Sequence, residues 1–371
     1  MGMGLPHPPA RHSADHGTGS RRIACLGILT ASALAFTVPL PQPLLDSWRQ
    51  GYASVQPAVT RASAWSPIAV LDMLIVGLAI MAVWLLWTRR GTLRVLPVII
   101  AVAVLAAALW LLFLVLWGWH YQVPTLEARF GLTPADVSAE HGEVFARATV
   151  AELNAGYAAA HATPWPTRTQ IASVLAPRLA HILPTVGVAW IPRLPTPRRT
   201  MLDWYFRTGG IDGMTNPFGL EILLNSRVLP VELPALAAHE YAHLAGFADE
   251  ADASVVAWLA CQSGPVALRY SGALAVLPHL LTGLPRVSQR SVIDGLADGP
   301  RADLHAIAAR LADQRPWVHA FAWQTYDRFL RANRVMEGVA RYDAVARVLI
   351  AVGDPVTGTL RRSPPAWPPS R

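Results

Sequence analysis

Lysine is absent from the 371-residue sequence, so all 31 basic residues are arginine. Genome base composition explains such a bias better than function does, and the bias excludes no class of protein. Cysteine is also scarce, since the whole chain holds only Cys25 and Cys261. At most one disulfide could form, and we expect none because the two residues lie in segments that should not meet.

Charged side chains are few as well. They make up 15% of the residues, where soluble domains have about 25%, and hydrophobic residues make up 53%. A disordered chain combines low hydrophobicity with high net charge, so this composition excludes one. It also disfavours a wholly soluble protein and indicates membrane segments joined to a globular part.

The net charge of +7 is concentrated near the N-terminus. Residues 1–118 carry eight arginines against three acids, whereas residues 119–371 carry 23 arginines against 21 acids. A basic excess beside apolar segments orients a membrane protein in the bilayer. A nucleic-acid-binding protein would instead gather its positive charge on one folded face. We therefore expect contact with a lipid bilayer and none with nucleic acid.

Three long apolar stretches predict transmembrane helices at about residues 23–40, 68–87 and 96–117. About twenty helical residues cover the roughly 30 Å hydrocarbon core of a bilayer. Tryptophans, which favour membrane interfaces, flank the second and third stretches at Trp65, Trp87, Trp117 and Trp119. The first stretch also resembles a signal peptide with a cleavage site at Ala33-Leu34-Ala35.

The arginines also predict the orientation in the membrane. Arg21 and Arg22 precede the first apolar stretch, and three further arginines lie in residues 88–95. Because basic loops stay on the cytoplasmic side, both interpretations of the first stretch place everything after Trp119 outside. We expect a multi-pass protein of the cell membrane. Residues 1–22 would form a disordered cytoplasmic tail, and the main domain would lie on the extracytoplasmic side.

Residues 119–353 are predicted to form one mostly helical domain. Apolar residues recur at helical spacing in residues 139–160, 302–311, 317–330 and 342–352. Glycines and an Asn-Pro pair interrupt residues 201–225, which predicts turns and a small hairpin or edge strand. Five prolines in the last eighteen residues predict a disordered tail over residues 354–371.

The most informative segment is His239-Glu240-Tyr241-Ala242-His243. Positions i and i+4 share one face of a helix, so His239 and His243 can offer both imidazoles to one metal ion. Glu240 lies beside them, where it can take a proton from a reacting water. Pro234 suits the first turn of this helix and Gly246 suits its end. The pattern predicts a Zn2+ site with Glu240 as general base.

Catalytic zinc has three protein ligands and an open fourth position. Asp249, Glu250 and Asp252 compete to be the third ligand. Asp249 stands where metzincins place their last ligand, whereas Glu250 begins an apolar segment that could present it from a second helix, as in gluzincins. Asp249 then suits the N-cap of that helix, and Asp252 suits its first turn. We predict that Glu250 completes the Zn2+ site, with Asp249 as the alternative.

Four other residues have competing interpretations. Tyr270 follows the predicted ligand helix and could donate a hydrogen bond to a reaction oxyanion, or it could pack in the core. Glu221 and Asn225 could line a cleft or cap local structure. Asp72 lies near the start of the second apolar stretch, and we favour an interfacial residue there over a functional intramembrane acid.

Several stretches resemble an uncharacterised family of bacterial membrane proteins, a domain of unknown function with several N-terminal spans and an extracytoplasmic His-Glu-x-x-His. They are residues 117–124, 213–221, 239–261 with 269–272, and 326–330. The chain departs from the family where His120 replaces Asn, where Leu244-Ala245 replaces a polar pair, and where Asp252-Ala253-Ser254 replaces Glu-Ala-Asn. The last departure weakens Asp252 as a ligand. The resemblance implies a zinc metallopeptidase and names no substrate.

The predicted fold class is mainly α, with N-terminal transmembrane helices followed by a zincin-like domain of gluzincin type with a small β element.

The predicted function is a membrane-anchored zinc metallopeptidase that cleaves peptide or protein substrates, such as envelope proteins. The alternative is a non-catalytic membrane scaffold or envelope sensor with a structural or vestigial metal site. Cys261 as a fourth ligand would favour that alternative, because structural sites close this position with Cys or His. An intramembrane protease is disfavoured, because the segments beside the motif are too short and polar to span a membrane.

Overall fold

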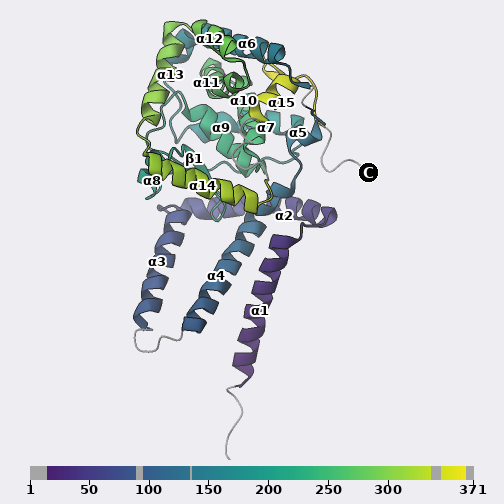
Figure 1. Cartoon of the computed structure of the whole chain (residues 1–371), viewed down its shortest axis with the longest axis vertical. Coiled ribbons are helices and arrows are strands. Elements are labelled where there is room, and N and C mark those ends of the chain that lie inside the picture. The colour runs from purple at the N-terminus through teal and green to yellow at the C-terminus, as the bar shows by residue number, and fades with distance from the viewer. Residues whose placement is uncertain (1–14, 89–94, 134–135, 336–343, 365–371) are drawn as a thin grey trace, which may run out of the picture.

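The computed structural model describes residues 15–88, 95–133, 136–335 and 344–364. Helices dominate these residues and the strands are short, which confirms the mainly helical prediction. Figure 1 shows three helices that extend in one direction and a helical domain that lies across their ends. We call residues 118–364 the main domain.

The three extended helices are α1 (Asp15–Thr37), α3 (Val70–Thr88) and α4 (Val95–Leu116). Among the described residues, only Leu96–Leu116 is by itself long and apolar enough to cross a membrane, and Val70–Leu85 is a shorter apolar helix. Ile23–Thr37 reaches that length only together with the next helix, from which it is bent by 108°. One or two spans therefore support association with a membrane, and the three-span topology stays a prediction.

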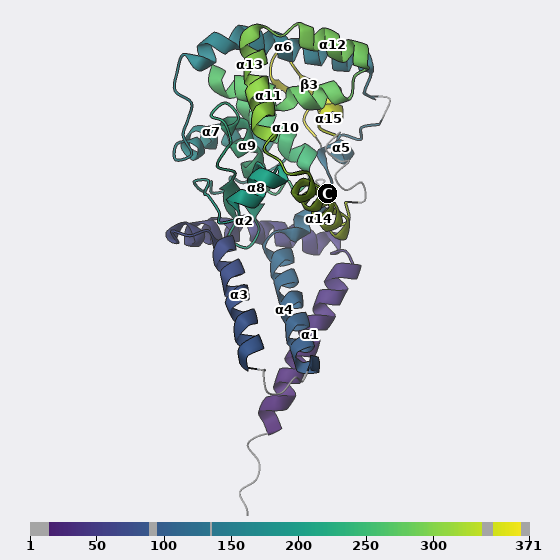
Figure 2. The same cartoon turned by 60° about the vertical axis from the view of Figure 1, so that its left-hand side comes forward.

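A helix that the sequence did not predict, α2 (Gln42–Trp65), lies across the ends of α1, α3 and α4 (Figures 1 and 2). Its buried residues are apolar Leu45 and Tyr52 together with polar Gln56, Thr60 and Ser63. Gln56 makes two hydrogen bonds of 2.9 Å with the backbone of Arg193, and Thr60 donates to the carbonyl of Leu220 at 2.8 Å. Hydrophobic periodicity detects a continuous apolar face, so it does not reveal a helix in which three of the five buried residues are polar.

Both predicted tails need correction. Helix α1 begins at Asp15, so residues 15–22 belong to this helix and not to a tail. Extending an existing helix is favourable, because each further residue that becomes ordered adds one backbone hydrogen bond. At the other end, β3 (Gly353–Asp354) pairs antiparallel with β4 (Thr359–Leu360). The Asp354 carboxylate accepts from the Val356 amide at 2.9 Å and holds this turn. Residues 1–14 and 365–371 lie outside the described part of the chain.

Helices also dominate the main domain. In chain order they are η1 (Gly118–Gln122), α5 (Leu126–Arg129), α6 (Ala139–His161), α7 (Ile171–Thr185), α8 (Asp203–Gly209), α9 (Leu233–Leu244), α10 (Glu250–Gln262), α11 (Val266–Thr282), α12 (Arg286–Asp294), α13 (Asp298–Leu311), α14 (Pro316–Ala332) and α15 (Ala344–Val352). In Figure 2, α9, α10 and α11 lie in the middle of the domain, with α6 and α12 at the end farthest from α2.

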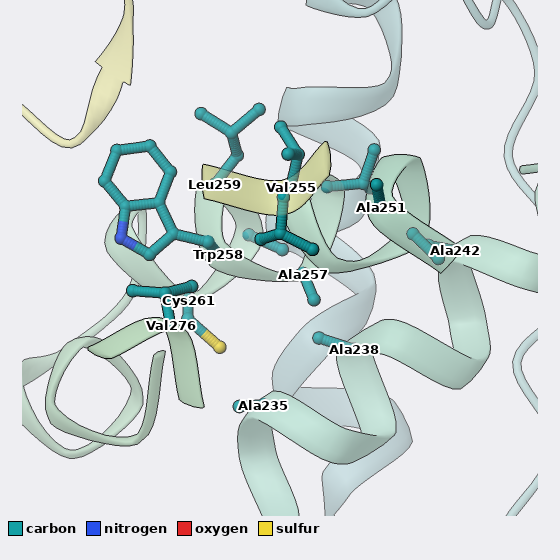
Figure 3. Close-up of a cluster of buried hydrophobic side chains, with 14 of the residues drawn as sticks. Ala235, Ala238, Ala242, Ala251, Val255, Ala257, Trp258, Leu259, Cys261 and Val276 are labelled. Carbon is teal, nitrogen blue, oxygen red and sulfur yellow. The ribbon is translucent and has the colours of Figure 1, made fainter. Parts of the chain in front are cut away.

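Helix α10 is the centre of the core. It packs against α7, α9, α11 and α15, and every residue from Ala251 to Cys261 except Ser254 is buried. A helix that is apolar on nearly every side belongs in a protein interior. Figure 3 shows small side chains of α9, among them Ala238 and Ala242, on the side that faces α10. These small residues let the two helices approach closely, which brings the first turn of α10 next to α9.

A short antiparallel hairpin lies beside α9. Strand β1 (Gly213–Asn216) pairs with β2 (Glu221–Leu224), with Gly213 opposite Leu224 and Asn216 opposite Glu221. Its presence confirms the small β element predicted in residues 201–225. Strand β2 also meets Arg198 in an isolated parallel bridge. In the described residues β1 is thus the edge strand, and it lies next to the helix that carries the histidines.

Asp72 joins the extended helices to the main domain. Its carboxylate accepts hydrogen bonds from the Thr200 hydroxyl at 2.5 Å and from the Met201 amide at 3.0 Å, and the residue is buried. Asp72 therefore has a structural role in holding α3 to the main domain, and its position at a membrane interface stays a prediction. Two further contacts join the N-terminal helices to the main domain. The Tyr52 hydroxyl of α2 donates to the Leu244 carbonyl at 3.1 Å, and the ring of Phe113 of α4 packs against that of Phe329.

Candidate metal centre

Three side chains from two helices converge at one point. His239 and His243 lie on one face of α9, and Glu250 is the first residue of α10. The two Nε2 atoms are 3.1 Å apart, and the Glu250 Oε2 atom lies 3.1 Å from His239 Nε2 and 3.7 Å from His243 Nε2. In the described part of the chain, this is the only group of three or more His, Cys, Asp or Glu residues arranged closely enough to hold a metal ion.

The three separations suit a tetrahedral ion. Ligand atoms about 2.0–2.2 Å from a tetrahedral zinc lie roughly 3.3–3.6 Å from one another. The observed separations of 3.1, 3.1 and 3.7 Å bracket this range. The donor set of two imidazoles and one carboxylate also matches what zinc accepts in catalytic sites. These residues therefore fit a zinc ion with one position left open.

Neighbouring groups hold the two imidazoles in this orientation. His243 Nδ1 lies 2.6 Å from the Phe247 carbonyl oxygen, which can only accept a hydrogen bond. Nδ1 therefore carries the hydrogen, and Nε2 keeps a lone pair for a metal. His239 Nδ1 lies 3.2 Å from the hydroxyl of Ser254, one turn after Glu250 on α10. The Trp117 indole packs against the His243 ring, with the ring centroids 6.1 Å apart.

A tight turn brings Glu250 to the histidines. Gly246 has a left-handed φ of +102° just after the end of α9, and the chain reverses there. Asp249 then caps α10, because its carboxylate accepts from the amides of Ala251 and Asp252 at 3.1 Å. The structure thus brings Glu250 to the two histidines and places Asp249 at the N-cap position.

The charges around the histidines favour a cation. Burial alone would lower the pKa of His243, but the carboxylates of Glu250 and Glu240 and the Phe247 carbonyl raise this pKa to about 9. Burial likewise acts to raise the pKa of Glu250, and the two imidazoles outweigh it and hold this pKa well below its usual range. A positive charge at this point is therefore stabilised by the surrounding carboxylates.

Glu240 lies beside the cluster and is held by the hairpin. The Thr215 hydroxyl of β1 donates to Glu240 Oε2 at 2.8 Å, and burial raises the pKa of the Glu240 carboxyl. A Cβ atom at Gly213 would lie only 2.5 Å from Glu240 Oε1, so a side chain there would displace the carboxylate. Thr215 and Gly213 were not predicted as site residues, although both lie in the stretch 213–221 that resembles the family.

Tyr270 lies away from the metal centre. Its hydroxyl donates to Asp303 at 2.6 Å, and its ring packs among those of Tyr157, His161 and Trp165. The adjacent Ser271 faces α9, where its hydroxyl accepts from the Ala235 amide. Successive helical residues are about 100° apart, so Tyr270 points toward α6 instead. The role predicted for Tyr270 in the site is therefore wrong.

The phenol at the metal centre belongs to Tyr326 of α14. Its hydroxyl donates to Glu250 Oε1, the oxygen that does not face the histidines. Tyr326 lies in the stretch 326–330 that resembles the family, and this resemblance is the one sequence signal that could have found it. Its contact holds the carboxylate so that Oε2 points at the two imidazoles.

The remaining candidates have structural roles. Glu221 accepts from Asn216 Nδ2 and the Leu71 amide, and Asn225 bonds the Ile211 carbonyl. Cys261 is buried against α11, where a Cβ atom at Gly272 would lie 2.7 Å from it. It lies eleven residues after Glu250 on the same helix, about 16 Å along the axis. Cys261 therefore cannot close the cluster as a fourth ligand.

A family model described as "Protein of unknown function (DUF3810)" matches residues 49–350. The chain belongs to this family. The match covers most of α2, all of α3 and α4 and nearly all of the main domain, so the candidate metal centre and the helices beside it lie within the DUF3810 region. No curated protein and no solved structure matches the chain. Membership confirms the resemblance to a family of unknown function and carries no information about activity.

We expect Tyr326→Phe to weaken zinc binding by this DUF3810 chain by roughly 10- to 100-fold, as loss of a hydrogen bond to a ligating carboxylate does. The variant keeps the ring and loses only the donor to Glu250. Competition with a fluorescent zinc chelator measures the dissociation constant. Tyr205→Phe on α8 is the matched control, because Tyr205 belongs to a second hydrophobic cluster away from the metal centre. Equal zinc affinity in the Tyr326 variant and the wild type would contradict the role of Tyr326.

Gly246→Ala should destabilise the fold by about 1–3 kcal/mol, the cost of a left-handed backbone in a residue other than glycine. The added Cβ would also lie 2.9 Å from the ring of His120. Gly283→Ala is the control, since Gly283 also ends a helix but has a φ of −79° and its nearest neighbour is 3.9 Å away. Thermal unfolding of both variants in detergent measures the difference, and equal midpoints would refute the expected strain.

Proposed function

We propose that this chain is a membrane-anchored, zinc-dependent metallopeptidase. His239, His243 and Glu250 would hold the zinc ion, and Glu240 would act as the general base. The observation that carries the proposal is the convergence of the three donors at the separations of a tetrahedral site, with one buried carboxylate beside them. The proposed domain is zincin-like and of gluzincin type, because the third donor comes from a second helix.

The residues around the centre have distinct tasks in this proposal. When bound, zinc supplies a Lewis acid that polarises a carbonyl and lowers the pKa of water toward neutrality. Thr215 holds Glu240 Oε2, and the described residues make no hydrogen bond to Oε1. Oε1 can therefore accept a proton from the attacking water and pass it to the leaving amine. Ser254, Phe247 and Tyr326 keep the three donors in place.

A polypeptide substrate is supported by the hairpin. Strand β1 lies next to α9, pairs with β2 on one side, and carries the Thr215 that holds Glu240. The free edge of a strand can pair with an extended peptide through main-chain hydrogen bonds. Such pairing would present a peptide carbonyl along the same strand that positions the general base.

The proposed topology has α1, α3 and α4 spanning the membrane, with the main domain on the extracytoplasmic side. The support is the apolar character of these helices, their common direction in Figure 1, and the arginines at positions 21, 22, 89, 90 and 94. A non-catalytic scaffold is less well supported. A structural site has no use for the Glu240 carboxylate, and Cys261 lies too far away to close the centre.

The proposal predicts that metal removal abolishes peptide cleavage and that zinc restores it. The full chain, purified in detergent, is tested on fluorescently labelled casein and on a mixed peptide library. It is assayed before dialysis against a chelator, after dialysis, and after addition of zinc. Cleavage that survives complete metal removal would contradict the proposal. A zinc-loaded chain that cleaves no member of the library would contradict it as well.

A further inference from the structure

Helices α8 and α14 expose a group of large apolar side chains on one surface. Trp317 and Phe321 lie one turn apart on α14 and are 66% and 61% exposed, and Met201 and Trp204 beside and within α8 are 60% and 46% exposed. The rings of Trp204 and Trp317 are 6.5 Å apart, which makes the group continuous. We call these four residues the aromatic face. An exposed apolar group of this kind marks a surface that contacts something other than water.

The position of the aromatic face is set by contacts at both ends of α14. Near its start, α14 packs on α8, and the segment before α8 is tied to the first turn of α3 through Thr200, Met201 and Asp72. Near its end, the Phe329 ring lies 5.6 Å from Phe113 of α4.

The C-terminal end of α14 also reaches α1. Arg334 follows the helix and donates to the carbonyl of Phe36, at the end of α1, at 3.2 Å. Helix α14 and the segments beside it thus contact the ends of α1, α3 and α4, and in Figure 1 α14 lies next to α2 on the side of the main domain. These ends mark the level at which the apolar helices would leave the hydrocarbon core.

The composition of α14 suits this level. Trp317 and Phe321 lie near the start of the exposed side of α14, and the exposed Arg328 and Arg331 follow on the same side toward its end. The Arg315 guanidinium lies 5.8 Å from the centre of the Trp204 ring. Aromatic rings favour the headgroup region of a bilayer, and arginines extend their charge from it toward water. An exposed side that carries both aromatic rings and arginines suits a helix that lies in the plane of the interface.

We propose that the aromatic face is immersed in the outer interfacial layer of the lipid bilayer, with α14 parallel to the membrane surface. This inference rests on the proposed spans α1, α3 and α4 and does not depend on the catalytic activity. The bilayer is favoured as the occupant because the region that carries the aromatic face is joined to the apolar helices at both ends, through the Met201 amide and Asp72 of α3 and through Phe329 and Phe113 of α4.

The proposal has a consequence for the substrate of the proposed peptidase. Trp317 and Tyr326 are nine residues apart, so they lie on opposite sides of α14. The side away from the lipid thus carries the Tyr326 hydroxyl that bonds Glu250. The metal centre is then separated from the membrane surface by about one helix diameter, roughly 10 Å. Polypeptides that are themselves anchored in the membrane would therefore be held within reach of the metal centre, and soluble peptides can also diffuse to it.

Spin labels test the depth of the aromatic face in the full chain. A cysteine-free background, with Cys25→Ser and Cys261→Ala, receives one of four single substitutions, Trp317→Cys, Phe321→Cys, Val102→Cys or Val287→Cys. Val102 is 53% exposed in the middle of α4 and reports lipid, and Val287 is 81% exposed on α12 at the far end of the domain and reports water. The proteins are placed in vesicles of phosphatidylcholine and phosphatidylglycerol. Power-saturation spectra then give the ratio of oxygen accessibility to that of a water-soluble nickel complex.

The expected ratio at Trp317 and Phe321 is several-fold above that at Val287 and below that at Val102. A ratio equal to that at Val287, with lipid contact at Val102, would overturn the interfacial position of α14 while the proposed spans stand. Low accessibility to both reagents would also overturn it, because the face would then be covered by protein, such as a second copy of the chain. A water-like ratio at Val102 would overturn the spans and this inference together. None of these outcomes bears on whether the metal centre hydrolyses peptides.

Discussion

Replacing Glu240 by glutamine is expected to lower peptide hydrolysis by on the order of 10²–10⁴-fold, the contribution of a positioned general base. The substitution keeps the shape of the side chain, and the amide oxygen can still accept the hydrogen bond from Thr215. Because Glu240 is not among the three converging donors, the variant should keep its zinc. Initial rates on a cleaved peptide and metal analysis of the same preparation test both expectations.

Glu152→Gln provides the control for this experiment. Glu152 is a partly buried carboxylate on α6 that bonds Gln262 at 3.0 Å and has no contact with the metal centre in the described residues. Its replacement should leave the rate and the zinc content unchanged. Full activity in Glu240→Gln would rule out general-base catalysis by this residue. Loss of zinc together with activity would show that Glu240 acts on the metal site itself.

Replacing His243 by alanine should remove bound zinc, because two donors cannot hold the ion against dialysis as three do. The wild-type chain should contain about one zinc per molecule, as a site with three protein ligands and an open position does. Metal analysis by mass spectrometry after dialysis measures the content. His161→Ala is the matched control, since His161 bonds Asp303 in the cluster around Tyr270.

His243 is 6% exposed and also bonds the Phe247 carbonyl, so its removal can disturb the fold. Glu250→Gln separates the two effects, because it removes the ligand charge and keeps both the volume and an acceptor for Tyr326. We expect a normal thermal unfolding midpoint and little bound zinc in this variant. Retention of zinc by both variants, or a wild-type chain that binds none after loading, would show that the histidines are core residues. The scaffold interpretation would then replace the peptidase.

The three converging donors could be predicted because their placement depends on local geometry. His239 and His243 are four residues apart on one helix, and Glu250 follows seven residues later across a turn that Gly246 permits. The capping role of Asp249 followed from the same local arguments. None of these positions requires knowledge of a distant part of the chain.

The residues that support the donors could not be found in this way. Tyr326 meets Glu250 across 76 residues of sequence, and Thr215 meets Glu240 across 25. Such contacts depend on how helices and strands pack against one another, and hydrophobic periodicity within one segment does not predict this packing. Tyr270 was predicted wrongly for the same reason. Its neighbour Ser271 faces α9, which carries the histidines, whereas the Tyr270 hydroxyl bonds Asp303 on another side of α11.

The sequence by itself determined the mainly helical fold, the apolar stretches beside the N-terminus, the small hairpin and the trio of candidate metal ligands. Each of these depends on composition or on spacing within a few turns, where backbone geometry relates sequence directly to structure. Only the tertiary structure decided the existence of α2, the burial of Asp72 and the position of α14 beside the ends of the extended helices. Each of these depends on hydrogen bonds between segments 128 to 298 residues apart, namely Gln56 with Arg193, Asp72 with Thr200, and Arg334 with Phe36. The stabilisation comes from distant partners, and no local pattern of residues encodes them.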